Sequence, residues 1–158
     1  MAKSLIINDI TYYTYADLTD AEIYNNAIYG STWSSLEEIV QKQLLVQASR
    51  KIDEYNYAGQ KLEPNQPLKF PRIMSNGKIS DDNVLIQLCC QIALYYWTNG
   101  TSSGGDTSNI LSGLSKWQIG DVHVDVKDDA KFDLTGLDDF IEQALAEWLQ
   151  NQGMQIWL

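Results

Sequence analysis

Cysteine, histidine and proline are all scarce in this sequence. The chain has 158 residues, of which two are cysteine, one is histidine and three are proline. So little proline excludes collagen-like and proline-rich architectures. Cys89 and Cys90 are adjacent in a segment of helical pattern, where successive side chains point about 100° apart, so they do not staple the fold. We expect two small apolar residues that stay reduced, as in a cytosol.

The single histidine leaves few routes to catalysis. His123 has neither the second histidine nor the cysteine pair that a usual zinc site needs, and no serine or cysteine stands beside it in a nucleophile context. The acids of residues 121–133 lack the central glycine and terminal glutamate of an EF-hand loop, which predicts a solvated acidic surface. We therefore expect no catalytic residue, no cofactor, no metal and no enzyme activity, and we interpret His123 as a plain strand residue.

Long apolar runs are also missing. No run approaches the roughly 20 residues of a membrane-spanning helix. The first ten residues lack a charged start followed by a long apolar stretch. The sequence therefore predicts no membrane span and no secretion.

Positive charge is in short supply and is unevenly placed. The chain has 11 Lys and Arg against 21 Asp and Glu, a net charge of -10, which argues against a protein that simply coats nucleic acid. Residues 42–78 hold seven cations and three acids, for a local charge of +4. Residues 1–41 sum to -5 and residues 79–158 to -9. Such asymmetry suits a subunit that meets unlike surfaces, including copies of itself, although solvated faces without a role explain any one patch equally well.

What is present is enough for one folded domain, because 44% of the residues are hydrophobic and 158 residues match the usual size of a domain. Capping-box pairs and apolar residues three or four apart predict helices over residues 20–29, 35–55, 81–99 and 137–150. Thr19 is the predicted N-cap of the first helix, with Glu22 as its capping-box partner. Residues 5–15 alternate loosely and predict an extended arm or edge strand. We expect a mainly α fold, a small bundle of about four helices.

Two further segments complete the expected architecture. Residues 56–80 lack periodicity and contain all three prolines, which predicts a long ordered loop packed by its apolar members. Apolar alternation around Gly120-Asp121 predicts one β-hairpin near residues 115–127. We divide the chain into residues 1–136, a helical domain with the hairpin, and residues 137–158, a C-terminal helix with an apolar docking tail.

The basic residues suggest a nucleic-acid alternative. Between Arg50 and Arg72, cations are interleaved with Tyr55, Tyr57 and Phe70, the two ingredients of a groove for single-stranded DNA. The competing interpretation is that the aromatic rings belong to the core and the cations cover them. We favour the second interpretation, because the rest of the chain would repel phosphate.

A longer pattern carries a family resemblance. The run Leu45-Val-Gln-Ala-Ser-Arg-Lys-Ile-Asp53 is followed by Tyr57-x-Gly59-x-Lys61, then by Pro64, Gln66-x-Leu68 and Phe70-Pro71-Arg72. It resembles a signature of tailed-phage head-tail connector proteins, the adaptor or head-completion proteins, some of which carry the label DnaT-like single-stranded-DNA-binding protein. The family pattern is A-T-R-x-I-D, W-K-G-x-K and Q-x-L-x-W-P-R. This chain departs from it at Ser49, Tyr57, Ala58 and Phe70. The likeness covers residues 15–97 and extends through residues 116–122, but not the final helix.

The resemblance implies a structural virion protein without catalysis. Such a protein oligomerises as a ring, commonly a dodecamer, under the phage portal protein. It extends the DNA channel, lets genomic double-stranded DNA pass without tight binding, and gives the tail or a stopper or tail-completion protein its platform. It would be assembled in the bacterial host cytoplasm and would lie in the virion neck. The alternative function is a single-stranded-DNA-binding accessory protein.

On the connector interpretation we assign interface roles to three groups of residues. A subunit or portal interface would use Arg50, Lys51, Lys69 and Arg72. The hairpin would brace a neighbouring subunit through Trp117, Val122 and Val124. The C-terminal element would dock through Trp148, Trp157 and Leu158.

Overall fold

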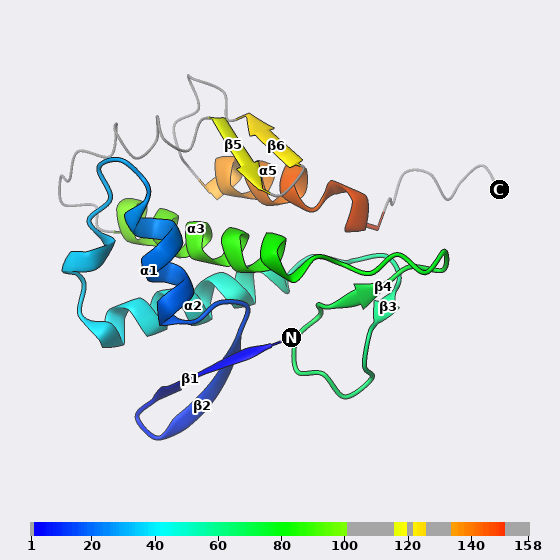
Figure 1. Cartoon of the computed structure of the whole chain (residues 1–158), viewed down its shortest axis with the longest axis horizontal. Coiled ribbons are helices and arrows are strands. Elements are labelled where there is room, and N and C mark those ends of the chain that lie inside the picture. The colour runs from blue at the N-terminus through cyan, green and yellow to red at the C-terminus, as the bar shows by residue number, and fades with distance from the viewer. Residues whose placement is uncertain (1, 101–115, 120–121, 126–133, 151–158) are drawn as a thin grey trace.

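The computed structural model describes residues 2–100, 116–119, 122–125 and 134–150. Within them, α3 (Asp82–Gly100) is the central helix and contacts α1 (Leu18–Asn26), α2 (Glu38–Ile52) and α5 (Leu134–Ala144), as Figure 1 shows. The strands form three antiparallel pairs, which are β1 (Lys3–Ile7) with β2 (Ile10–Thr14), β3 (Gln60–Lys61) with β4 (Arg72–Ile73), and β5 (Lys116–Ile119) with β6 (Val122–Asp125). Two 3₁₀ turns, η1 (Trp33–Ser35) and η2 (Ala146–Trp148), precede α2 and follow α5.

The fold class expected from the sequence is wrong. The described residues form a mixed α/β structure with three two-stranded sheets, rather than a mainly helical bundle with one hairpin. The predicted hairpin is present as β5 and β6, and its turn lies outside the described residues. The two additional sheets lie in segments that we expected to be an extended arm or edge strand and a long ordered loop. Their formation depends on turn geometry and loop closure, which hydrophobic periodicity does not report.

The N-terminal arm is a hairpin because of its turn residues. Asn8 and Asp9 have φ of 50° and 63°, the two left-handed positions of a tight hairpin turn, and Asn and Asp tolerate that region well. The turn places Ile7 opposite Ile10 and directs Leu5 and Ile7 into the core. The next helix, α1, is capped by Asp17 with Asp20 as reciprocal partner. The predicted cap at Thr19 with Glu22 is therefore incorrect.

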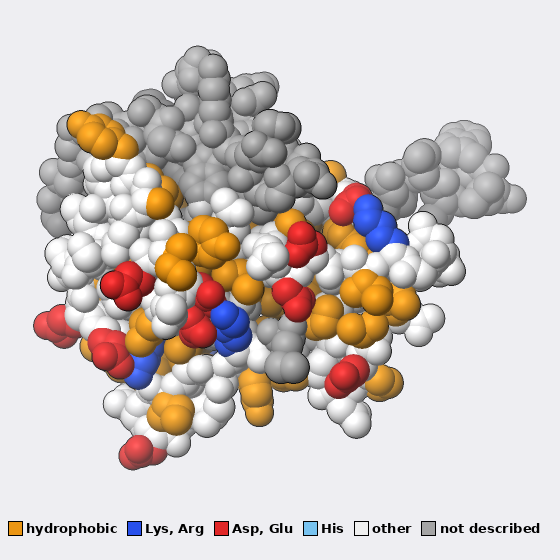
Figure 2. Space-filling model, viewed as in Figure 1, with side chains coloured by type: hydrophobic (Ala, Val, Ile, Leu, Met, Phe, Trp, Pro, Cys, Tyr) orange, Lys and Arg blue, Asp and Glu red, His pale blue; other side chains and the backbone are white. Residues whose placement is uncertain are grey.

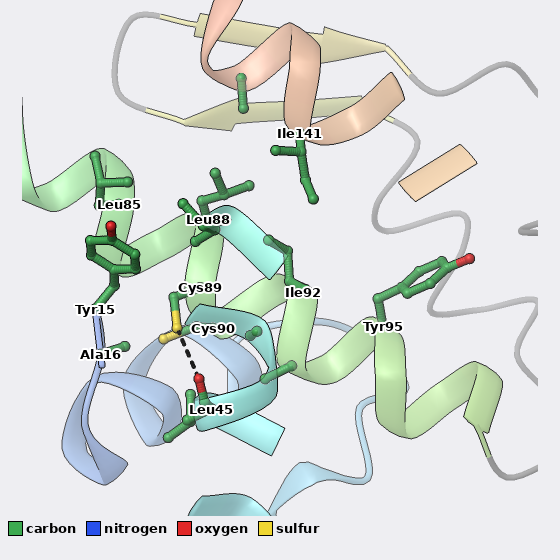
Figure 3. Packing of buried hydrophobic residues seen from close by; sticks show 14 of the residues in the cluster. Tyr15, Ala16, Leu45, Leu85, Leu88, Cys89, Cys90, Ile92, Tyr95 and Ile141 are labelled. Carbon is green, nitrogen blue, oxygen red and sulfur yellow. Dashed lines mark hydrogen bonds between the residues drawn. The ribbon is translucent and has the colours of Figure 1, made fainter. Parts of the chain in front are cut away.

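The core surrounds α3, which is apolar on several faces. Its buried residues include Leu85, Leu88, Ile92 and both cysteines, as expected for its sequence pattern. Figure 3 shows Leu88 and Ile92 lying toward Ile141 of α5, and the Cys89 thiol donating to the carbonyl of Leu45 of α2 at 3.7 Å. Because three other helices pack against it, α3 holds α1, α2 and α5 in one core.

The remaining helices differ from their predicted ranges at the ends. The predicted helix over residues 35–55 is shorter, since Ser35 lies in η1 and α2 ends at Ile52. The last helix begins at Leu134 and continues into η2 after Ala144. Leu137, Ile141, Leu145 and Trp148 are buried in the same cluster as the rest of the core. The domain boundary at residue 136 stays a prediction.

Candidate functional site

The basic segment, residues 42–78, runs from α2 through the long loop to β4. Its loop is held in place chiefly by Arg72. The Arg72 guanidinium donates to the carbonyls of Ala58 and Gly59 at 2.9 Å each. It also donates to the Lys69 carbonyl at 3.2 Å and the Tyr57 carbonyl at 3.3 Å. One side chain therefore joins the two strands of the loop.

The loop also depends on a close backbone approach at Gly59. Its φ is +76°, and a Cβ at this position would lie 2.5 Å from the Ile73 carbonyl oxygen. A side chain here would clash with backbone that cannot move without breaking the β3–β4 pairing. The glycine and arginine of the family-like signature thus serve the same local structure.

Asp53, the last residue of the A-S-R-K-I-D run, anchors the loop to α2 and β2. The Tyr15 hydroxyl donates to Asp53 Oδ1 at 2.5 Å and accepts from the Phe70 amide at 3.1 Å. The Lys69 amide donates to Asp53 Oδ2 at 3.3 Å. Burial raises the pKa of Asp53, although the hydrogen bonds from Tyr15 and the Lys69 amide oppose that shift. This carboxylate is occupied by internal donors, which gives it a positioning role.

The aromatic residues of the loop belong to the core, which is the interpretation that we favoured from the sequence. Tyr57 and Phe70 are buried, and their rings meet edge to face with centroids 4.6 Å apart. Trp148 of η2 also packs edge to face on Phe70, with ring centroids 6.0 Å apart. Tyr55 is half-buried and its hydroxyl donates to Asp138. The described structure therefore does not place Tyr57 and Phe70 where bases could stack on them.

Two of the predicted interface lysines are engaged within the chain. Lys51 Nζ lies 2.8 Å from Asp138 and 3.0 Å from Glu54. Partial burial acts to lower the pKa of Lys51, but its bonds to Asp138 and Glu54 outweigh burial and raise the pKa above its ordinary value. Lys69 Nζ donates to the Tyr55 carbonyl at 2.7 Å. These contacts tie α2, the loop and α5 together.

Arg50 is different, because it remains exposed at the end of α2. Its guanidinium carbon lies 5.9 Å from the centre of the Tyr12 ring. Lys61 is also exposed and makes only a long bond, 3.3 Å, to the Gln66 carbonyl among the contacts described. Of the cations in the basic segment, these two are the best placed to meet a partner.

The other predicted interface residues are divided among three settings. Trp148 is buried against Phe70, and its carbonyl accepts from the Ala58 amide at 2.7 Å. Trp117, Val122 and Val124 lie on the paired strands β5 and β6. Trp157 and Leu158 lie outside the described residues. The predicted interface roles of these residues stay predictions.

Other chemistry is sparse in the part of the chain that the structure describes. No three His, Cys, Asp or Glu side chains there are grouped to hold a metal ion. None of the described helices combines the length and apolar character needed to cross a membrane. Cys89 and Cys90 are buried and free, and burial raises the pKa of Cys89 to about 12. A thiol with so high a pKa is a poor nucleophile.

One surface feature escaped the sequence analysis. A groove of about 500 Å³, called here the apolar groove, lies between β2, the loop and the start of α3. Its lining includes Tyr13, Leu62, Pro71 and Ile79. Figure 2 shows hydrophobic side chains gathered in the region of β3 and β4. Leu62, expected to pack inside the loop, is instead 40% exposed.

Comparison with known proteins assigns the chain to a family. A family model described as "Putative DnaT-like ssDNA binding protein" matches residues 5–158. The chain belongs to this DnaT-like family. No curated protein and no solved structure matches it. The family description names single-stranded DNA as a ligand.

Within this member of the DnaT-like family, the signature residues have structural roles. Asp53, Gly59 and Arg72 fix the loop through the contacts given above, and Phe70 fills its base. The family match agrees with the resemblance found in the sequence as far as the DnaT-like label, and it does not extend to a phage connector. A role as a phage connector therefore remains a proposal.

Proposed function

We propose that this protein is a structural subunit of the head-tail connector of a tailed phage, assembling as a ring under the portal. The observation that carries the proposal is the use of the signature residues inside the fold. Arg72, Asp53 and Phe70 lock a long loop onto α2 and η2. A pattern that specifies a rigid scaffold suits a protein whose work is to hold partners in fixed positions.

The charge of the chain supports the same proposal. At -10, the chain repels phosphate, and an acidic lining lets duplex DNA pass without being held. The proposed partners are copies of the chain itself, the portal and a tail or tail-completion protein. The proposed place is the virion neck, after assembly in the host cytoplasm. No catalytic activity is part of the proposal.

A second candidate, single-stranded-DNA binding, has direct support from the family description. The comparison favours this candidate more than the connector. The exposed Arg50 and Lys61 would supply its electrostatic contacts. The burial of Tyr57 and Phe70 removes two of its expected stacking platforms, so any affinity would depend mainly on phosphate contacts and would fall steeply with salt.

Native mass spectrometry across protein concentration, with and without a short single-stranded oligonucleotide, separates the two candidates. The connector proposal expects a closed oligomer of one defined size that forms without DNA. A monomer that takes up the oligonucleotide stoichiometrically contradicts it and supports DNA binding. An R50Q/K61Q variant should then lose that uptake, while K78Q, which removes a cation paired with Glu147 at 2.5 Å, serves as control.

A further inference from the structure

The β1–β2 hairpin has one face turned to solvent with unusual apolar content. Pairing puts Ile6 opposite Thr11 and Ser4 opposite Tyr13. Side chains alternate along a strand, so these four lie on one face, away from buried Leu5 and Ile7. Ile6 and Tyr13 are diagonal neighbours, within reach of an aromatic side chain. The hairpin therefore carries an uncharged surface with two large apolar groups.

This surface continues into the apolar groove, because Tyr13 belongs to both. Leu62 and Ile79 also line this groove. We call Ile6, Tyr13, Leu62 and Ile79 the outer face. Their exposed fractions are 59%, 53%, 40% and 53%, so each large side chain is about half open to solvent.

The size of the outer face matches one side of a protein interface. At roughly 150–200 Å² for a large side chain, the four half-exposed residues leave about 350 Å² of apolar surface open. Pro67 and Pro71 of the groove add to it. A standard interface buries about 800 Å² on each partner, of which about 57% is apolar, or roughly 450 Å².

The charge of the molecule favours this face for contact between copies. Two chains of net charge -10 repel each other over most of their surfaces. The hairpin positions Ser4, Ile6, Thr11 and Tyr13 carry no charge, so a second copy meets no like charge there. Glu63 and Asp82 also line the groove, and the rim of an interface is where charged residues ordinarily lie.

We infer that the outer face packs against a second copy of this chain. The inference rests on the proposed assembly function and names the surface through which assembly proceeds. Apolar burial is the driving force, and the position of the contact is set by the rigid register of the hairpin and by the walls of the groove.

Matched lysine substitutions test this inference. Ile6 and Ile23 are 59% and 62% exposed, but Ile23 lies on α1, outside the outer face. Sedimentation equilibrium should show I6K weakening self-association by about tenfold or more, and I23K leaving it unchanged. Each substitution makes the chain less negative by one charge, so charge repulsion alone would strengthen association in both. An unchanged urea midpoint confirms that each variant is folded.

Thiol labelling gives an independent readout. Both native cysteines are fully buried, so a cysteine placed at position 62 or 23 is the accessible thiol. The L62C thiol should react with a maleimide more slowly in the assembled oligomer than in the dissociated monomer, whereas the I23C thiol should react at the same rate in both.

These experiments distinguish a failure of the outer face as the contact from a failure of the connector proposal on which it rests. A ring that forms equally well from wild type, I6K and I23K overturns the outer face as the contact, while the connector proposal stands. Equal labelling rates of the L62C thiol in the oligomer and in the monomer overturn it as well. A wild-type protein that stays monomeric at every concentration tested contradicts both the inference and unaided ring assembly.

Discussion

The Tyr15 hydroxyl is the best point at which to test the loop anchor. It donates to Asp53 Oδ1 and accepts from the Phe70 amide, and the Tyr15 side chain is buried. Tyr15→Phe removes both bonds and leaves the ring in place, so it creates almost no cavity. The buried Phe70 amide and one oxygen of the Asp53 carboxyl then lose a partner, while the Lys69 amide still serves the other oxygen.

The expected loss follows from those two groups. A buried polar group left without a partner costs about 1–3 kcal/mol. Asp53 keeps one donor and some contact with water, so we expect a total loss of about 2–4 kcal/mol in the free energy of unfolding. With a urea m value of about 2 kcal/mol/M, the middle of the usual range, the midpoint should fall by about 1–2 M.

Urea titration followed by tryptophan fluorescence and circular dichroism measures this change. Tyr29→Phe is the control, because Tyr29 is 79% exposed and its variant should lie within about 0.5 kcal/mol of wild type. Tyr15→Phe should also raise the pKa of Asp53 further, since it removes a bond that favours the charged form. A loss below about 0.5 kcal/mol, equal to that of the control, would refute the anchor role.

Two other predictions concern the loop and its contact with α5. Arg72→Lys should lower the free energy of unfolding by about 2 kcal/mol, because one ammonium cannot reach the four carbonyls that the guanidinium fork spans. Arg50→Lys should cost under about 0.5 kcal/mol, and equal costs in urea titration would contradict the clamp. Hydrogen bonds from Lys51 and Tyr55 hold the pKa of Asp138 below its ordinary 3.8. Ionised Asp138 therefore stabilises the folded state above pH 3.8, and this stabilisation is lost as the pH falls through the lower, folded-state pKa. Asp138→Asn should therefore flatten the fall of the urea midpoint between about pH 5 and pH 3, and an unchanged profile would show that the bond contributes nothing to stability.

Some of the fold followed directly from sequence. The rows of apolar residues over 81–99 predicted α3 almost to its ends. A helix that is buried on several sides carries apolar residues at most of its three- and four-residue spacings, so its period is easy to recognise in the sequence. The alternation around Gly120-Asp121 predicted β5 and β6. Both depend on local pattern, which is what a single sequence reports best.

The N-terminal hairpin was missed although its signal is local. Asn8-Asp9 is a dipeptide suited to two left-handed residues, but the flanking alternation is weak because Ile6 and Ile10 remain exposed. The capping residue of α1 was misplaced for a similar reason. Asp17 and Thr19 both precede a suitable acid by three residues, and only the path of the chain out of β2 selects Asp17.

The site was less accessible to sequence reasoning than the helices. The aromatic and cationic residues of the loop were identified, but nothing local shows that Arg72 turns inward to carbonyls of residues 57–59. The apolar groove joins Tyr13, Leu62 and Ile79, which are distant in sequence and meet only once the loop has closed. Features of this kind arise from tertiary packing, and no periodicity encodes them.

The contact between Phe70 and Trp148 has a consequence for the newly made chain. Trp148 follows Phe70 by 78 residues, about 4–16 s of translation at roughly 5–20 residues per second. Throughout that interval Phe70 lacks its cover from η2, and the carbonyl that accepts from the Ala58 amide does not yet exist. The loop is therefore completed only after residue 148 has left the ribosome. Nascent or truncated chains that end before residue 148 should present this aromatic surface to chaperones and proteases, and chains that include η2 should conceal it.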